Sequence, residues 1–145
     1  MVDKTLLLRK LADLQEYMKQ VGEYSNIKVS EYSKDWKIQR ITERTLQMMI
    51  EICVDIANHI ISDSEYRVPK SYADTFKVLY ENNILEKRLF TKMEKMAKFR
   101  NIIVHHYDNI DEAIVVGILK KDLKDFIKYK DAIINLLKKE SGLQN

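Results

Sequence analysis

The decisive stretch of this sequence is Phe99-Arg100-Asn101-Ile102-Ile103-Val104-His105-His106-Tyr107-Asp108, which ends a predicted helix. Apolar residues recur along that helix at alternating steps of four and three, as on a buried face, at Leu89, Met93, Met96 and Ile103. The position that this stripe predicts between Met96 and Ile103 is taken by Arg100. A guanidinium is always charged and is rarely buried unless it is paired or binds an anion. The helix is therefore predicted to turn one cation toward an apolar seam.

Two histidines and a tyrosine follow Arg100 at the point where the helix is expected to end. Histidine is the side chain best suited to give or take a proton under physiological conditions, which makes His105 a candidate for proton transfer. A guanidinium binds phosphate oxygens through charged hydrogen bonds. Arg100, His105 and Tyr107 together therefore suit a site that handles a phosphate group.

The spacing of these residues restricts the geometry of such a site. Positions five apart on a regular helix point about 140° away from each other, so Arg100 and His105 cannot share one face. Either the helix unwinds near Val104, or two subunits share the site. Asn101 and His105 are four apart and are expected to be neighbours, while Arg100, Ile103 and Tyr107 are predicted to lie on one line. A cleft between two symmetry-related helices satisfies this arrangement best.

Each of these residues also has a purely structural interpretation. His105 and His106 would be favourable partners for the dipole and free carbonyls of a helix C-terminus. Arg100 could anchor its helix by pairing with a carboxylate such as Glu51 or Asp55, and Tyr107 could simply be packed.

Length and composition favour one all-α domain over residues 1–145. The chain is 46% hydrophobic and 32% charged, and it has only three glycines and one proline, which favours long helices joined by short loops. No apolar run reaches the roughly 18 to 20 residues of a membrane span, and no signal peptide is recognisable, so we expect a cytoplasmic protein without membrane contact. The lone Cys53 is expected to be a buried thiol.

Periodicity predicts an up-and-down bundle of four to five main helices. The boundaries that the pattern indicates are Lys4 to Tyr24, Asp35 to Ser62, a short helix opened by Ser71 and ended by Asn82, a helix from Leu85 or Glu86 to the decisive stretch, and Asp122 to Lys139. One extra turn is expected near Ser30 to Ser33. Ser71-Tyr72-Ala73-Asp74 resembles a capping box in which Asp replaces Glu. Asp111 is expected to cap a further short helix, with an irregularity near Gly117.

The longest predicted helix, from Asp35 to Ser62, is apolar over most of its circumference. Such a helix is buried by its own bundle and by something else, for which a second copy of the chain is the simplest candidate. A narrow polar line remains, at Arg44, Glu51, Asp55 and either Asn58 or His59. This line could be a thin solvated face, or it could line a polar cleft, and the two interpretations are equally open.

The pattern Arg-x4-His-x-Tyr, formed by Arg100, His105 and Tyr107, resembles the signature of the HEPN superfamily and, within it, the HepT-like toxins. The resemblance extends to the long helix over Trp36 to Ile61 and to Pro69-Lys70-Ser71-Tyr72, the entry to the short helix. It implies a HEPN-like homodimer that is a metal-independent endoribonuclease. Arg100 and His105 would be catalytic, and Asn101 and Tyr107 would support them.

The resemblance also implies a protein partner. In HepT-like toxins a minimal nucleotidyltransferase antitoxin transfers AMP to the tyrosine of this pattern, which is Tyr107 here. The chain would need no cofactor, since it has neither the ligand spacing of a metal site nor a glycine-rich phosphate loop. The alternative is a non-catalytic helical dimer that binds a nucleotide or a nucleotidyltransferase partner through the same cleft.

Lysine is concentrated near the C-terminus, where residues 120–139 contain seven lysines against three aspartates. A surplus of this kind is commonly a solvated helix face, but it could also guide RNA toward the site.

Overall fold

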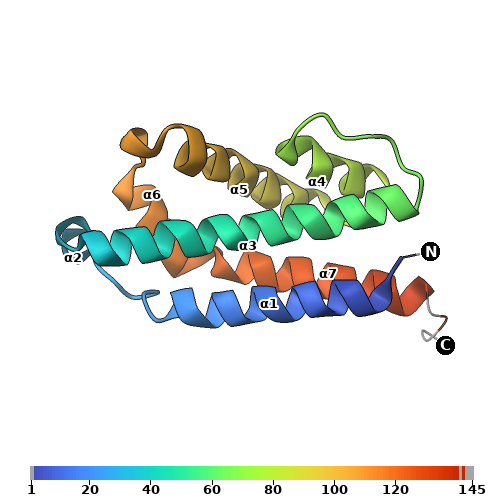
Figure 1. Cartoon of the computed structure of the whole chain (residues 1–145), viewed down its shortest axis with the longest axis horizontal. Helices are drawn as coiled ribbons and strands as arrows, with labels where there is room; N and C mark the ends of the chain where they lie inside the picture. Colours follow the sequence, from blue (N-terminus) through green and yellow to red (C-terminus); the bar gives the residue numbers. More distant parts are fainter. Residues whose placement is uncertain (1, 141, 143–145) are drawn as a thin grey trace.

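Helix α3 (Trp36–Asp63) runs along the molecule, and the other helices are arranged around it (Figure 1). The computed structural model describes residues 2–140 and 142, and in these residues the regular structure is helical, with no strand. Asp35 begins α3, because its carboxylate accepts hydrogen bonds from the backbone N–H groups of Lys37 and Ile38, each at 3.1 Å. An acidic N-cap satisfies amides that have no partner within the helix.

Two groups of helices flank α3. Helices α1 (Lys4–Gly22) and α7 (Leu123–Glu140) lie on one side, and α4 (Tyr72–Glu81) and α5 (Lys87–His105) lie on the other (Figure 1). Helix α5 runs in the opposite direction to α3. The predicted bundle is confirmed, and the predicted ends of these helices agree with the observed ones to within two residues.

Short helical segments close the end of the bundle where α5 finishes. They are α2 (Val29–Lys34), the 3₁₀ turn η1 (Tyr107–Asn109), α6 (Glu112–Gly117) and the π-helical turn η2 (Ile118–Asp122). Asp111 caps α6, as predicted, by accepting a hydrogen bond from the N–H of Ala113 at 2.9 Å. Glu112 then ties α6 to the start of α3, because it accepts hydrogen bonds from Ser33 and from Gln39.

The core is formed by the buried apolar faces of the four long helices and α4. In α5 the stripe residues Leu89, Met93, Met96 and Ile103 are all buried. Helix α3 buries side chains toward both flanking groups, which accounts for most of its wide apolar surface within one chain. Its exceptions are Trp36 and Ile41, which remain 65% and 47% exposed. Among the described residues, no helix is both long and apolar enough to cross a membrane.

The predicted capping box at the start of α4 forms only in part. Ser71 accepts the hydrogen bond from the N–H of Asp74, but the Asp74 carboxylate accepts from the N–H of Lys70 instead of that of Ser71. The short aspartate also receives two hydrogen bonds from Arg67, which draw it toward the preceding loop.

Candidate functional site

Arg100 lies between α5 and α3 and pairs with Glu51. Its Nη2 and Nε atoms are 2.7 Å and 2.9 Å from Glu51 Oε2. The Arg100 side chain is only 16% exposed, against 33% for that of Glu51. A cation so little exposed to water needs a counter-charge, and α3 supplies it. The structural interpretation predicted that Arg100 pairs with a carboxylate such as Glu51 or Asp55. The structure confirms this pairing, and the partner is Glu51.

Three more side chains hold the Arg100 guanidinium in place. Tyr72, at the start of α4, lies beneath it with the ring centroid 4.5 Å from Cζ, in cation–π contact. Gln47 donates a hydrogen bond to Glu51 at 3.2 Å, and Asn101 accepts one from Arg100 Nη1 at 3.3 Å. The guanidinium is thus oriented by residues of three helices. Neither Tyr72 nor Gln47 was predicted to belong to the site, because a contact between different helices leaves no periodic signal in the sequence.

His105 is the last residue of α5 and is exposed. The helix stays regular to this point, so the unwinding near Val104 that could have brought His105 beside Arg100 does not occur. Asn101 is also exposed and lies one turn before His105 on the same side of α5. Within one chain, Arg100 and His105 therefore point away from each other, and Asn101 lies between them.

Tyr107 does not continue the line of Arg100 and Ile103, and that prediction was wrong. His106 ends α5 with backbone angles outside the helical region, and Tyr107 begins the separate turn η1. Tyr107 is 72% exposed. The helix ends two residues earlier than the predicted line requires, and periodicity alone cannot place such an end.

In the predicted polar line of α3, Arg44 and Asn58 are exposed, and Glu51, Asp55 and His59 are partly exposed. Part of this line and the apolar side chains beside it form an accessible surface, which we call the open stripe. It consists of Ile41, Arg44, Met48, Glu51, Ile52 and Asp55, all partly or fully exposed. Glu51 and Asp55 also line a shallow depression with Asp13 and Tyr17 of α1. Arg44 is not part of that depression. It lies two turns before Glu51, and since α3 and α5 are antiparallel, this places it toward the level at which α5 ends.

Several other titratable groups are accounted for by the fold. Asp55 forms an ion pair with Lys10, and its Oδ1 atom lies 3.7 Å from Nε2 of His59. Asp55 and His59 are therefore part of a group of interacting surface side chains. Cys53 is fully buried, and burial raises the pKa of its thiol, which makes it unsuited to be a nucleophile. The described residues contain no cluster of three or more His, Cys, Asp or Glu side chains that could hold a metal ion.

Comparison with known proteins identifies the family. The family model "Ribonuclease HepT-like" matches residues 14–133. The mRNA nuclease HepT of Shewanella oneidensis is 32% identical over 129 residues, which cover 88% of this chain and 96% of that protein. The chain belongs to the HepT-like ribonuclease family. The resemblance that Arg100, His105 and Tyr107 indicated is thereby confirmed.

Other HepT-like proteins agree with this assignment. The tRNA nuclease HepT of Aphanizomenon flos-aquae is 30% identical over 112 residues, or 76% of this chain and 75% of that protein. Among solved structures, a tri-AMPylated Shewanella oneidensis HEPN toxin in complex with MNT antitoxin aligns with a TM-score of 0.84 at 30% identity. That alignment covers 92% of this chain and 99% of the toxin chain. The HepT-like fold therefore extends over nearly the whole chain.

Proposed function

We propose that this HepT-like chain is a toxin-type endoribonuclease that cleaves RNA in the cytoplasm without a metal ion. Family membership and the nuclease names of its relatives support the activity. The observation that carries the assignment to residues is the oriented Arg100 guanidinium with an exposed His105 at the end of the same helix. A phosphate-binding cation and a proton-transferring imidazole are the two groups that phosphodiester cleavage requires.

The reaction is an attack of the ribose 2′-hydroxyl on the adjacent phosphorus. His105 takes the 2′-hydroxyl proton as general base, the bond from O2′ to phosphorus forms, and the bond from phosphorus to O5′ breaks. A general acid protonates the departing O5′, and the products are a 2′,3′-cyclic phosphate and a free 5′-hydroxyl. One His105 cannot serve as acid and base in the same step, so a second copy of the chain supplies the other imidazole.

Arg100 stabilises the charge that develops on the non-bridging oxygens. A guanidinium has five N–H donors. In this structure Nε and Nη2 face Glu51 while Nη1 faces Asn101, so part of the donor set stays available for phosphate. Glu51 holds the guanidinium in a fixed orientation, and Asn101 lies between it and His105.

The open stripe of α3 is the face through which we expect two copies to pair. It combines the accessible apolar side chains of Ile41, Met48 and Ile52 with the polar residues Arg44, Glu51 and Asp55. It also borders Arg100 through Glu51. Pairing through this face around a two-fold axis would bring the two α5 helices, and with them both His105 side chains, toward one cleft.

Inhibition by a partner nucleotidyltransferase belongs to the same proposal. The solved toxin that resembles this chain is tri-AMPylated and bound to its MNT antitoxin. Tyr107 is the exposed phenol nearest in sequence to His105, so AMP on its hydroxyl would place bulk and negative charge at the mouth of the cleft. RNA phosphate would then be repelled and sterically excluded.

Substitution of His105 tests the nuclease proposal most directly. His105→Ala is expected to lower RNA cleavage at least about 100-fold, because a general acid–base residue commonly contributes that much. The matched control is His106→Ala, an adjacent exposed histidine that has no role in the proposed reaction, and it should cleave like the wild type. Cleavage of labelled RNA by the two purified variants, with EDTA present, is the measurement.

Arg100→Ala is a less selective probe than His105→Ala. It removes the partner of a half-buried carboxylate, Glu51, and is therefore expected to loosen the packing of α5 against α3 as well as to stop cleavage.

Full activity in purified His105→Ala would contradict the assignment of His105 as a catalytic residue. RNA binding without cleavage by the wild type would favour the non-catalytic alternative.

A further inference from the structure

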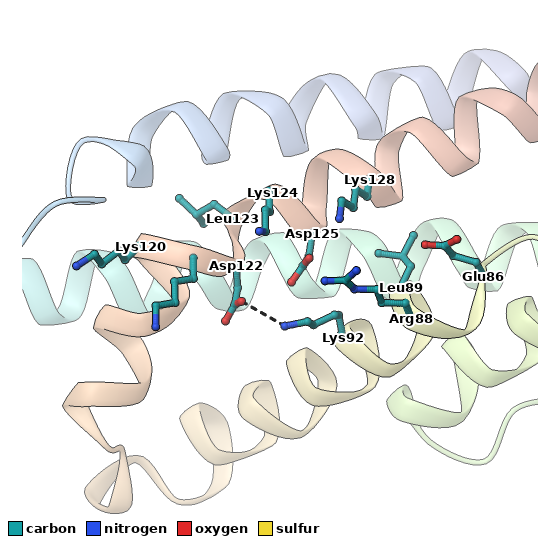
Figure 2. A pocket seen from close by; sticks show the side chains of 11 residues that line it. Glu86, Arg88, Leu89, Lys92, Lys120, Asp122, Leu123, Lys124, Asp125 and Lys128 are labelled. Atoms are coloured by element: carbon teal, nitrogen blue, oxygen red, sulfur yellow. Dashed lines mark ion pairs between the residues drawn. The ribbon is translucent and has the colours of Figure 1, made fainter.

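A second candidate site lies away from Arg100 and His105, in a pocket of about 470 Å³ between α5 and the start of α7. Figure 2 shows Arg88 and Lys92 reaching into it from α5, and Lys124 and Lys128 along its opposite side. We call this the basic pocket. Its full lining is Glu86, Arg88, Leu89, Lys92, Lys120, Lys121, Asp122, Leu123, Lys124, Asp125 and Lys128.

The charge of the basic pocket is strongly asymmetric. Six of its lining residues are basic and three are acidic. One of the acids, Asp122, is already paired, since its Oδ1 is 3.6 Å from Lys92 Nζ. Lys120 and Lys121 of η2 and Lys124 of α7 are exposed. Clustered cations in a concavity concentrate positive potential there and attract an anionic ligand.

The pocket wall also contains an acceptor that the fold leaves unsatisfied. Asp125 is only 3% exposed, and its Oδ2 atom has no hydrogen-bond partner among the described residues. Burial, with a smaller contribution from Asp122, raises the pKa of this carboxyl. Buried polar atoms without a partner are rare in proteins and call for an explanation such as a ligand. The adjoining turn η2 is π-helical, an irregularity frequent at functional sites.

The basic pocket continues into a neighbouring depression of about 580 Å³ along α7. The two share Glu86, Leu89 and Lys128. The second depression is lined by amides and an aromatic ring, among them Asn82, Asn83, Asn135 and Tyr66. Together they form a groove with cations at one end and hydrogen-bonding and stacking groups at the other, the combination by which proteins hold single-stranded nucleic acid.

We propose that the basic pocket binds phosphate groups of an RNA strand, outside the site at which the same strand is cleaved. The proposal rests on the proposed function, because it assigns this groove to the substrate of that reaction. The lysines would contact phosphates, and the amides and the Tyr66 ring of the adjoining depression would meet the bases. An inorganic anion would satisfy the cations alone, whereas RNA carries both kinds of group.

The position of the pocket sets the length of RNA that can use it. Lys92 and His105 are thirteen residues apart on α5. At 1.5 Å per residue this is about 20 Å, or about six nucleotides at 3.4 Å each in a stacked strand. RNA shorter than this cannot occupy both places, so the pocket should affect long substrates and leave very short ones unchanged.

The six basic side chains of the pocket could also attract an acidic surface of a partner protein. The concave shape favours RNA, because a pocket of this volume encloses a group of small-molecule size, whereas a folded partner presents a flat surface.

Charge reversal at two exposed lysines tests the proposal. The variant Lys120→Glu/Lys124→Glu lowers the net charge by four, since each substitution changes it by two. The control, Lys4→Glu/Lys19→Glu, makes the same change at exposed positions of α1. Both are measured on the full chain in two assays: anisotropy of a labelled 20-nucleotide single-stranded RNA with His105→Ala added to prevent cleavage, and cleavage kinetics with active His105.

The pocket variant should bind the 20-nucleotide RNA about tenfold more weakly than the control, with a log–log salt dependence shallower by about 1.4, or about 0.7 per lost phosphate contact. In the cleavage assay its KM for this RNA should rise about tenfold with kcat unchanged, while a trinucleotide is cleaved as by the wild type. Equal binding by the two variants would overturn the proposal.

Further arms separate the possible ligands. AMP and inorganic phosphate, at the same phosphate concentration as the RNA, should not displace it, and displacement would identify a free phosphate compound as the ligand instead. Weaker binding of the partner nucleotidyltransferase with unchanged RNA binding would identify a protein docking surface and overturn the RNA assignment. RNA binding is measured with His105→Ala, which prevents cleavage. The binding test therefore remains interpretable even if the nuclease proposal fails.

Discussion

In the proposed reaction, Arg100 serves packing and chemistry through the same guanidinium. Its contacts with Glu51 and Tyr72 fasten α5 to α3 and α4, and they also prevent the side chain from sampling other rotamers. A fixed cation does not have to reorganise when charge develops on a phosphate. The nearby carboxylate weakens its field but leaves it a net donor, because two of its five N–H donors are engaged by neither Glu51 nor Asn101.

At the residue scale, Tyr107 is the position whose modification the fold allows most readily. Incubation with the partner nucleotidyltransferase and ATP is expected to add one or more AMP units to Tyr107, because its hydroxyl is on an exposed turn just beyond His105. Intact-protein and peptide mass spectrometry detect the added mass and its position. Modification should be accompanied by loss of RNA cleavage, since the added phosphate repels the substrate.

Tyr107→Phe is the direct control for this prediction, because it removes only the acceptor oxygen. It should stay unmodified and should still cleave RNA in the presence of the nucleotidyltransferase. The partly buried tyrosines of the rest of the chain, which are Tyr17, Tyr24, Tyr66, Tyr72 and Tyr80, test specificity in the same spectrum. AMP found on a different residue of Tyr107→Phe, with inhibition preserved, would show that another hydroxyl is the acceptor.

The residue pattern predicted some of these contacts and missed others for identifiable reasons. A buried arginine demands a counter-charge, and the polar line of α3 offered Glu51 and Asp55, so the partner of Arg100 could be narrowed to two. Which of Glu51 and Asp55 pairs with Arg100 depends on the axial register of α3 against α5, and the sequence pattern of one helix does not determine that register. Tyr72 lies in the segment that was predicted to open α4, but its role under the guanidinium depends on how α4 packs.

At the element scale, the link between α3 and α4 is held by charge. Arg67 donates two hydrogen bonds to Asp74, at 2.9 Å and 2.8 Å, and a further one to Glu81 at 2.7 Å. Asp74 also accepts from the N–H of Lys70. A bidentate arginine–carboxylate pair fixes geometry better than a lysine contact. The loop after α3 is thereby tied to the first turn of α4, the turn that carries Tyr72 to Arg100.

Asp74→Asn is predicted to destabilise the protein in a manner that depends on pH. The Arg67 guanidinium, and then the N–H of Lys70, hold the pKa of Asp74 well below its usual range. A carboxyl with a depressed pKa stabilises the fold above its unfolded pKa, about 3.9, and loses that contribution as the pH falls toward the folded value. At pH 7 the loss should be about 1 kcal/mol, or about 2–5 °C in Tm.

Thermal unfolding by circular dichroism, followed from pH 7 to pH 3, measures this effect. The difference in Tm between wild type and Asp74→Asn should be largest at neutral pH and should narrow below pH 4. Asp131→Asn, at an exposed position of α7, is the matched control and should follow the wild type throughout. A difference in Tm that is constant over the whole range would mean that ionisation of Asp74 is not its source.

At the scale of the whole molecule, the fold follows from periodicity more fully than the site does. Few glycines and one proline, together with long stripes such as Leu89 to Ile103, were enough to predict the helices and their order. The width of the apolar surface of α3 was attributed in part to a second copy, yet packing on both sides within one chain accounts for most of it. The part of the α3 surface that remains available for contact with a second copy is the open stripe.

The open stripe leads to a prediction about assembly. Ile41→Glu places a charge on this stripe at a side chain that is 47% exposed in the single chain. If two copies pair through the open stripe, the buried charge will separate them, and the mass in solution will fall from about twice to once 17.2 kDa. Cleavage should be lost with it, because a single chain supplies only one His105.

Ile127→Glu is the matched control for Ile41→Glu, since Ile127 is 49% exposed but lies on α7, away from the open stripe. It should keep both the doubled mass and the nuclease activity, as measured by light scattering after gel filtration and by RNA cleavage on the same fractions. Both variants should retain the helical circular dichroism of the wild type, because each isoleucine is already about half exposed.

A wild type that is a monomer yet cleaves RNA with full His105 dependence would show that one chain suffices. The general acid would then have to be sought within the same chain, among the exposed groups around His105.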